Sequence, residues 1–140
     1  MQLEASISID RPVATVWDFY AVHHVENHPR WDPDLELEKV TDGPIGVGTV
    51  IRRRSVRFGT PTEGTMEVVA FEPERLMWVE TRDGDTTIHG RARLDDLGGG
   101  RTELTIGGDF VDMDYSMEET IRRLLERSLA TIKDLIESET

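Results

Sequence analysis

The sequence predicts an α+β fold in which a curved antiparallel sheet of six to seven strands wraps around one long C-terminal helix. Three observations lead to this fold. Residues 3–9 alternate apolar and polar side chains, and five or six later segments do the same, as strands with one buried face do. Two short segments with helical spacing separate the first strand from the others. From Ser116 onward the apolar residues recur with the period of a helix.

The first strand covers about residues 2–9, and two short helices are expected after it. A helix over residues 13–20 can begin at Pro12, because the first turn of a helix does not need the N–H that proline lacks. Residues 23–30 can form a second short helix, which we expect Pro29 and Pro33 to end. These helices should follow the first strand along the chain and precede the other strands.

The middle of the chain consists of alternating segments joined by short turns rich in Gly, Asp and Pro. Such regular spacing is typical of an antiparallel meander. The Gly107-Gly108 pair falls inside the last segment and predicts a bulge or bend that curves the sheet. The predicted strands cover residues 35–41, 49–58, 64–71, 75–82, 86–94 and 101–111.

The C-terminal segment reads as an amphipathic helix of about 22 residues, roughly 33 Å long at 1.5 Å per residue. Ser116 and Glu119 have the spacing of a capping box at its start. A helix of this length can cross the whole sheet and form its second layer. Its apolar stripe comprises Met117, Ile121, Leu124, Leu125, Leu129, Ile132, Leu135 and Ile136.

Composition limits the class of protein. The 140 residues suffice for one domain with a hydrophobic core, and the absence of cysteine excludes disulfides and thiol chemistry. A net charge of −12 disfavours nucleic acid and anionic lipid as partners. No apolar run approaches the roughly 20 residues of a membrane helix, and the N-terminus does not resemble a signal peptide. We therefore expect a cytoplasmic protein without membrane insertion.

Several short motifs together resemble the SRPBCC superfamily, also called START-like or polyketide cyclase/dehydrase-like. The resemblance covers essentially the full chain. The matching pieces are Ile9-Asp10-Arg11-Pro12-Val13, Val16-Trp17-Asp18-Phe19, Pro29-Arg30-Trp31-Asp32-Pro33, Gly46-Val47-Gly48-Thr49, Phe71-Glu72-Pro73-Glu74-Arg75-Leu76, Gly100-Arg101-Thr102-Glu103-Leu104 and the closing helix.

The resemblance implies a helix-grip fold, one domain over residues 1–140, with a deep and mainly apolar cavity between the C-terminal helix and the sheet. Relatives with this fold bind lipids, sterols, hormones or polyketides; some cyclise polyketides, and others bind protein partners. We therefore expect the partner to be a small hydrophobic molecule that is lipid-, polyketide- or aromatic-like. No cofactor and no metal are expected, and a homodimer is left open. The expected ligand-binding residues are Tyr20, Trp31, Arg52, Arg54, Met66, Val68, Trp78, Glu80, Ile88, Met117, Ile121 and Leu125.

Three consecutive arginines make the orientation of the strand at 49–58 ambiguous. Either Arg52 and Arg54 point inward, or Arg53 does, because neighbouring side chains of a strand lie on opposite faces. A buried arginine needs a carboxylate or an anionic ligand. It could hold a ligand carboxylate or enolate oxygen, form an internal ion pair with Glu67 or Glu80, or reach solvent near the sheet edge.

The segment from Leu76 to Glu80 is ambiguous for a different reason, since both of its faces carry apolar residues. If Trp78 faces inward, Glu80 does too and becomes a candidate cavity acid with a raised pKa. If Met77 and Val79 face inward, Trp78 and Glu80 are solvated. The first orientation is the one that we expect. By the same alternation, His89 should face solvent.

His24 and His28 are four residues apart and share one face of the second short helix. That spacing can bind a divalent metal, but no third ligand has suitable spacing. We therefore interpret the two histidines as exposed polar residues of the helix. Trp31, nearby, is expected either at the mouth of the cavity or in the core.

Three functions remain candidates. The first is a binding module for a hydrophobic small molecule, which we favour. The second is a cyclase or dehydratase that acts on a polyketide-like substrate, with Arg52 or Arg54, Tyr20 or Tyr115, and Glu80 as the available groups. The third is a protein-interaction domain with a filled core. A cavity would favour the first two over the third.

Overall fold

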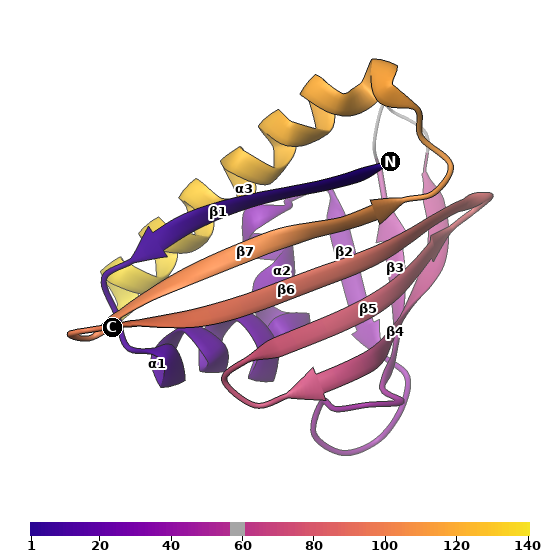
Figure 1. Ribbon diagram of the computed structural model, residues 1–140. Coiled ribbons are helices and arrows are strands. Elements are labelled where there is room, and N and C mark those ends of the chain that lie inside the picture. The colour runs from indigo at the N-terminus through magenta and orange to yellow at the C-terminus, as the bar shows by residue number, and fades with distance from the viewer. Residues whose placement is uncertain (57–60) are drawn as a thin grey trace.

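The computed structural model describes residues 1–56 and 61–140. It confirms the predicted α+β fold and its order of elements (Figure 1). The last residues of the strand expected over 49–58 lie outside the described residues. The elements are β1 (Gln2–Ile9), α1 (Val13–Trp17), the π-helical turn η1 (Asp18–Val22), α2 (His24–Trp31), β2 (Leu35–Lys39), β3 (Val50–Ser55), β4 (Thr62–Glu72), β5 (Leu76–Asp83), β6 (Thr86–Gly98), β7 (Arg101–Phe110), the 3₁₀ turn η3 (Tyr115–Met117) and α3 (Glu118–Glu139).

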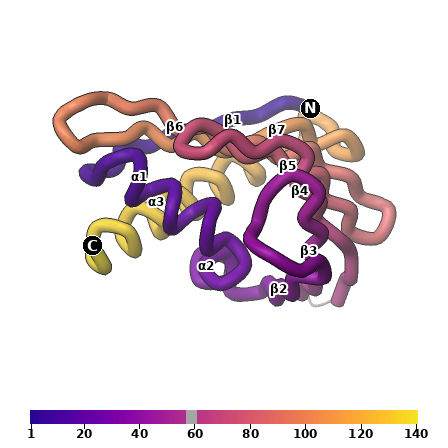
Figure 2. Tube along the Cα trace, turned by 90° about the horizontal axis from the view of Figure 1, so that it is seen from below, coloured from indigo at the N-terminus to yellow at the C-terminus, as the bar shows by residue number. Residues whose placement is uncertain are grey.

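The seven strands form one antiparallel sheet in the order β1-β7-β6-β5-β4-β3-β2. Strands β2 to β7 therefore follow one another as a meander, and β1 joins the edge beside β7. Viewed from below, α1, α2 and α3 all lie on one side of the sheet, which curves around them (Figure 2). The helices cover the inner face, where a site between helix and sheet can form.

A pair of glycines bends β7 where it passes between β1 and β6. Gly107 and Gly108 have φ values of 154° and 148°, a region that other residues rarely adopt. A Cβ atom on Gly107 would lie 2.1 Å from the carbonyl oxygen of Leu3, and one on Gly108 would lie 1.9 Å from that of His89. The register continues without a shift through both residues, so the glycine pair forms a bend and not a bulge.

Helix α3 buries a narrower stripe than its sequence predicts. Ile121, Leu129, Ile132 and Ile136 are buried, whereas Met117 and Leu124 are exposed. Leu129, Ile132 and Ile136 join the core that Ile9, Val16, Trp17 and Leu104 form, whereas Ile121 packs in a second cluster with Leu3 and Phe110. No helix among the residues that the structure describes is long and apolar enough to cross a membrane.

The capping box predicted at the start of α3 is wrong. Asp114 accepts a hydrogen bond from the backbone N–H of Ser116 at 2.9 Å and caps the 3₁₀ turn that precedes the helix. Glu119 instead pairs with Arg123 one turn later, at 2.7 Å. The extra turn moves the start of α3 to Glu118 and leaves Ser116 outside it.

The two predicted short helices are present, but their bounds differ from those expected. The helix expected over 13–20 divides into α1 and the π-helical turn η1. Pro29 lies inside α2, which ends at Trp31, two residues before Pro33. The helix continues to Trp31, whose side chain is buried against Phe19 and Tyr20, and this packing compensates for the hydrogen bond that Pro29 cannot make.

Candidate functional site

A cavity of about 200 Å³ lies between the inner face of the sheet, α2 and α3. It is larger than an engineered cavity of about 150 Å³ that holds benzene, and smaller than the roughly 300 Å³ at which pockets for drug-sized ligands begin. The sheet and α3 supply a mainly apolar wall of Met66, Met77, Val79, Ile88, Ala92, Ile106, Phe110, Met113, Ile121, Leu124 and Leu125. Its other polar and aromatic residues are Tyr20, His24, His28, Trp31, Asp32, Arg53, Thr81, Arg91 and Ser128.

Stacked rings form the wall on the side of α2. The rings of Tyr20 and Trp31 are stacked, with centroids 5.4 Å apart and an interplanar angle of 12°. His28 stacks on Trp31 at 4.9 Å and 23°. These residues and His24 recur at intervals of three and four along η1 and α2, and that spacing places them on one helical face. Aromatic rings that pack on one another therefore line this side of the cavity.

His24 and His28 form a hydrogen-bonded pair in this wall. Nδ1 of His24 lies 2.7 Å from the backbone oxygen of Tyr20, and Nε2 of His24 lies 3.0 Å from Nδ1 of His28. Burial lowers the pKa of His24 to about 4, although its bond to the Tyr20 carbonyl acts in the opposite direction. Burial also raises the pKa of the Tyr20 hydroxyl.

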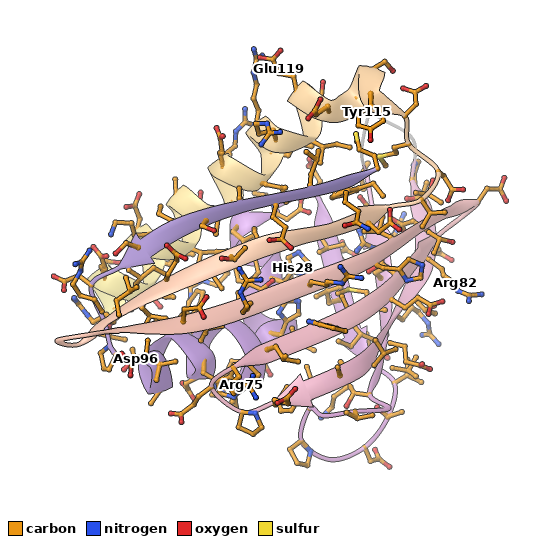
Figure 3. All side chains as sticks on the ribbon, in the orientation of Figure 1. His28, Arg75, Arg82, Asp96, Tyr115 and Glu119 are labelled. Atoms are coloured by element: carbon orange, nitrogen blue, oxygen red, sulfur yellow. The ribbon has the colours of Figure 1, made fainter. Side chains whose placement is uncertain are left out.

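The interpretation of both histidines as exposed polar residues is therefore wrong. His24 is 2% exposed and His28 is half-buried, because their helical face turns toward the sheet. In Figure 3, His28 lies behind the strands, on the side of α2. No group of three or more metal-ligating side chains occurs within residues 1–56 and 61–140.

The structure resolves the ambiguity of the three arginines in favour of the middle one. Arg53 is 6% exposed and lines the cavity, while Arg52 and Arg54 are exposed on the outer face. Arg52 and Arg54, which we expected among the ligand-binding residues, therefore face away from the cavity. Inner-face positions of β3 alternate as Ile51, Arg53 and Ser55, all buried, and this alternation fixes the face of each arginine.

The carboxylate partner of Arg53 is Asp83, at the end of β5, and not Glu67 or Glu80. Nη2 of Arg53 lies 3.2 Å from Oδ2 of Asp83. The sequence gives no direct sign of this pairing, because Asp83 precedes Gly84 in what reads as a turn. The carboxylate of Asp83 thus supplies the opposite charge that the buried guanidinium of Arg53 requires.

The orientation that we expected for β5 is also wrong. Met77 and Thr81 are buried on the inner face, whereas Trp78 is 39% exposed on the outer face. Arg91 lies over the Trp78 ring, 5.1 Å from its centroid. Hydrogen bonding and charge from Arg82 hold the pKa of the Glu80 carboxyl below its usual range, the opposite of the raised pKa expected for a cavity acid.

Three more of the expected residues lie away from the cavity. Val68 is buried in the core beside it, and Met117 is exposed at the start of α3. Tyr115 is exposed on the adjoining 3₁₀ turn, at the periphery of the molecule (Figure 3). The constellation expected for a cyclase is thus reduced to Tyr20, with Arg53 in place of its neighbours.

Half of the expected ligand-binding residues do line the cavity, although their contact with a ligand stays a prediction. They come from five elements and are Tyr20, Trp31, Met66, Ile88, Ile121 and Leu125. Sequence reasoning did not place His24, His28 and Asp32 at the cavity, and it had an inward Arg53 only as an open alternative. The helical spacing of positions 20, 24, 28 and 31 would have indicated the two histidines, because Trp31 and Tyr20 were already expected at the cavity.

Comparison with known proteins agrees with this geometry. Residues 1–137 match the protein family described as polyketide cyclase/dehydrase and lipid transport. No curated protein sequence matches the chain. The match therefore rests on a family and not on an individual relative.

Solved structures share the fold at low sequence identity. A START superfamily protein from Mycobacterium smegmatis superposes with a TM-score of 0.78, at 13% identity over 99% of both chains. The Zhui aromatase/cyclase from Streptomyces sp. R1128 has a TM-score of 0.76 and 17% identity, over 98% of this chain and 93% of that one. Ara h 8.0201 has a TM-score of 0.76 and 15% identity over 99% of both chains. At these identities the likeness concerns the fold alone.

Proposed function

This chain belongs to the polyketide cyclase/dehydrase and lipid transport family, and from that premise we propose that it binds a compact hydrophobic molecule in the cavity between α2, α3 and the sheet. Membership of the family suggests hydrophobic ligand binding. The observation that carries the proposal is the cavity itself, whose walls are mainly apolar. Apolar surface that is buried by a ligand is removed from water, which favours binding.

The size and shape of the cavity support a ligand of one or two rings over a long acyl chain. Its volume of about 200 Å³ exceeds what benzene requires but falls short of pockets for larger ligands. The stacked rings of Tyr20, Trp31 and His28 offer flat surfaces, on which a planar molecule can stack with aromatic geometry. Met66, Met77 and Met113 on other walls are flexible and can adapt to its outline.

The ligand is expected to carry a polar group as well. Arg53, His28 and Thr81 line the same cavity, and a purely hydrocarbon ligand would leave them facing apolar surface. A polar group directed at them would fix the orientation of the ligand, as a few placed polar groups do in small-molecule sites.

A filled-cavity variant tests the proposal. Ile88 lines the cavity, whereas its neighbour His89 is exposed on the opposite face of β6. Naphthalene serves as the probe, with binding measured by isothermal titration calorimetry. Ile88→Trp should weaken binding at least tenfold, and the matched variant His89→Trp should leave the affinity within about twofold of the wild type. Equal effects of the two variants, or no binding by the wild-type protein, would refute the proposal.

A second candidate function is a cyclase or dehydratase reaction on a polyketide-like substrate. The buried Arg53 and the half-buried Tyr20 in one cavity favour it, because an arginine can stabilise an enolate oxygen while a hydrophobic wall orients the chain. The Zhui aromatase/cyclase shares the fold. The third candidate, a protein-interaction domain, was expected to have a filled core. The cavity therefore favours the other two functions over it.

A further inference from the structure

A second apolar groove lies outside the cavity, on the side of η1 and α2 that faces away from it. We infer that this groove binds a hydrophobic α-amino acid, whose ammonium group meets Glu26 and whose carboxylate meets Lys39. The groove has a volume of about 320 Å³, and pockets for small molecules begin at roughly 300 Å³. It shares no lining residue with the cavity, so binding here does not depend on the function proposed above.

Most of the groove is lined by apolar side chains. Trp17 is buried and Phe71 is half-buried, and their rings pack on one another with centroids 5.0 Å apart. Val22 and Val25 line the helical side, and Val22 is 44% exposed. An apolar side chain of a ligand would cover this surface and remove it from water, which favours binding.

Another wall of the groove is the loop between β2 and β3, which lies beside α2 (Figure 2). The N–H of Gly46 donates to Oγ1 of Thr49 at 2.9 Å, and the N–H of Thr49 donates to the oxygen of Gly46 at 3.0 Å. The N–H of Gly48 donates to the oxygen of Val68 at 2.8 Å, which joins the loop to β4. Ile45, which lines the groove, packs against the main core. These contacts hold the wall in place without a ligand, so binding does not have to order it.

Two side chains of opposite charge complete the groove. Glu26 comes from α2, and Lys39 comes from the end of β2. Lys39 donates a hydrogen bond to the backbone oxygen of Gly43, which carries no charge. Among the residues that the structure describes, neither Glu26 nor Lys39 forms a salt bridge, with the other or with a third side chain. Each can therefore pair with a charged group of a ligand without breaking an existing ion pair.

This combination of charges suits a ligand that carries both signs. A carboxylate alone would be repelled by Glu26 and by the net charge of −12, and an ammonium group alone would be repelled by Lys39. A zwitterion has no net charge and can pair with both residues, while its side chain enters the apolar part of the groove. An α-amino acid with an aromatic or branched side chain has these three features.

Four compounds with the same phenyl group test this selection: L-phenylalanine, 3-phenylpropanoate, 2-phenylethylamine and N-acetylphenylalanine amide. They carry both charges, the negative charge alone, the positive charge alone and no charge. Each is titrated into the ¹⁵N-labelled full chain at pH 7.5, and the backbone amides are followed by NMR. L-Phenylalanine should shift the amides of Val25 and Ile45 with one saturable affinity and leave that of Ile88, in the cavity, in place. It should bind about tenfold more tightly than each of the other three, because each lacks at least one charged contact.

Variants of the two charged residues assign the contacts. Both residues are exposed, so Glu26→Gln and Lys39→Met should leave the fold intact. Each should weaken the binding of L-phenylalanine about fivefold or more. Glu26→Gln should bind 3-phenylpropanoate as tightly as L-phenylalanine, and Lys39→Met should do the same for 2-phenylethylamine. The matched control is Glu38→Gln, next to Lys39 but paired with Arg52 outside the groove, which should keep the affinity within about twofold of the wild type.

Several results would overturn the inference. Equal binding of L-phenylalanine and N-acetylphenylalanine amide would show that the groove accepts an uncharged peptide side chain instead. Equal binding of L-phenylalanine and either singly charged compound by the wild type would show that one charge suffices. Shifts confined to Ile88, or no saturable shift at all, would exclude the groove as the site. None of these results bears on naphthalene binding in the cavity, which the same labelled sample tests separately.

Discussion

Arg53 and Asp83 form an ion pair that reaches across an intervening strand. Nη2 of Arg53 lies 3.2 Å from Oδ2 of Asp83, and the two side chains are only 7% and 16% exposed. Gly64 of β4 is paired with Arg53 on one side and with Asp83 on the other. Because Gly64 has no side chain, the two charged groups meet over it on the inner face of the sheet.

Replacement of Asp83 by Asn should destabilise the protein strongly. A buried guanidinium that loses its carboxylate remains in a low-dielectric site, which typically costs about 3 to 5 kcal/mol. Urea denaturation at pH 7 measures the change. The matched control is Glu80→Gln, because Arg82, the partner of Glu80, is 68% exposed on the outer face and that pair should contribute less than about 1 kcal/mol. Equal losses for the two variants would contradict the buried role of Asp83.

Gly64→Ala should also destabilise the protein, by at least about 2 kcal/mol. A Cβ atom at this position would lie 1.7 Å from the carbonyl oxygen of Arg82 and 2.8 Å from Oδ1 of Asp83, so the backbone must move. Gly46→Ala is the control, since nothing lies within 4 Å of its Cβ position. Thermal unfolding of both variants checks the prediction, and a Gly64→Ala variant as stable as Gly46→Ala would contradict it.

The fold could be predicted because its signals are repeated and local. Every strand carries its own alternation and turn, and α3 has a long apolar period, so an error at one boundary leaves the others unchanged. The errors lie where a tertiary contact decides. Helix α2 continues past Pro29 because Trp31 is buried. Ser116 does not cap α3 because a 3₁₀ turn, Tyr115–Met117, precedes that helix.

The site was harder to predict, because it depends on which face of each strand is inward. In β5 both faces carry apolar residues, so alternation alone could not decide between Trp78 and Met77. In β3 three adjacent arginines occupy both faces of the strand, and the partner of the inward one, Asp83, lies 30 residues away and next to a turn. A pairing of this kind is set by the register of three strands and has no local signal. The cytoplasmic location stays a prediction.

Simultaneous replacement of Arg52 and Arg54 by alanine should leave ligand binding intact. Both side chains lie on the outer face, opposite the cavity. Naphthalene affinity should stay within about twofold of the wild-type value, with a stability change below about 1 kcal/mol because both groups are solvated. A tenfold loss of affinity in a variant that remains folded would show that these arginines act on the cavity after all.

The stability of the protein should fall between pH 6.5 and pH 5 because of His24. The unfolded chain protonates this residue near pH 6.5, whereas the folded protein does so only near pH 4. Acid therefore favours the unfolded chain, and the contribution of neutral His24 is complete above pH 6.5 and is lost as the pH falls toward 4.

Urea denaturation at half-unit pH intervals measures this dependence. At about 1.4 kcal/mol per pH unit, the loss between pH 6.5 and pH 5 should approach roughly 2 kcal/mol. His24→Phe should remove most of it, while His89→Phe, on the exposed outer face, should retain it. A His24→Phe variant whose stability follows the wild-type pH curve would contradict the assignment.

The most direct test of the binding cavity uses its methionines as reporters. Met66, Met77 and Met113 line the cavity, whereas Met117 lies outside it at the start of α3. Protein labelled with ¹³C at the methionine methyl groups is titrated with naphthalene and followed by NMR. We predict that the three cavity methyls shift together with one saturable affinity while the Met117 methyl stays in place. Shifts confined to Met117, or no saturable shift at any methionine, would contradict a ligand-binding cavity between the helices and the sheet.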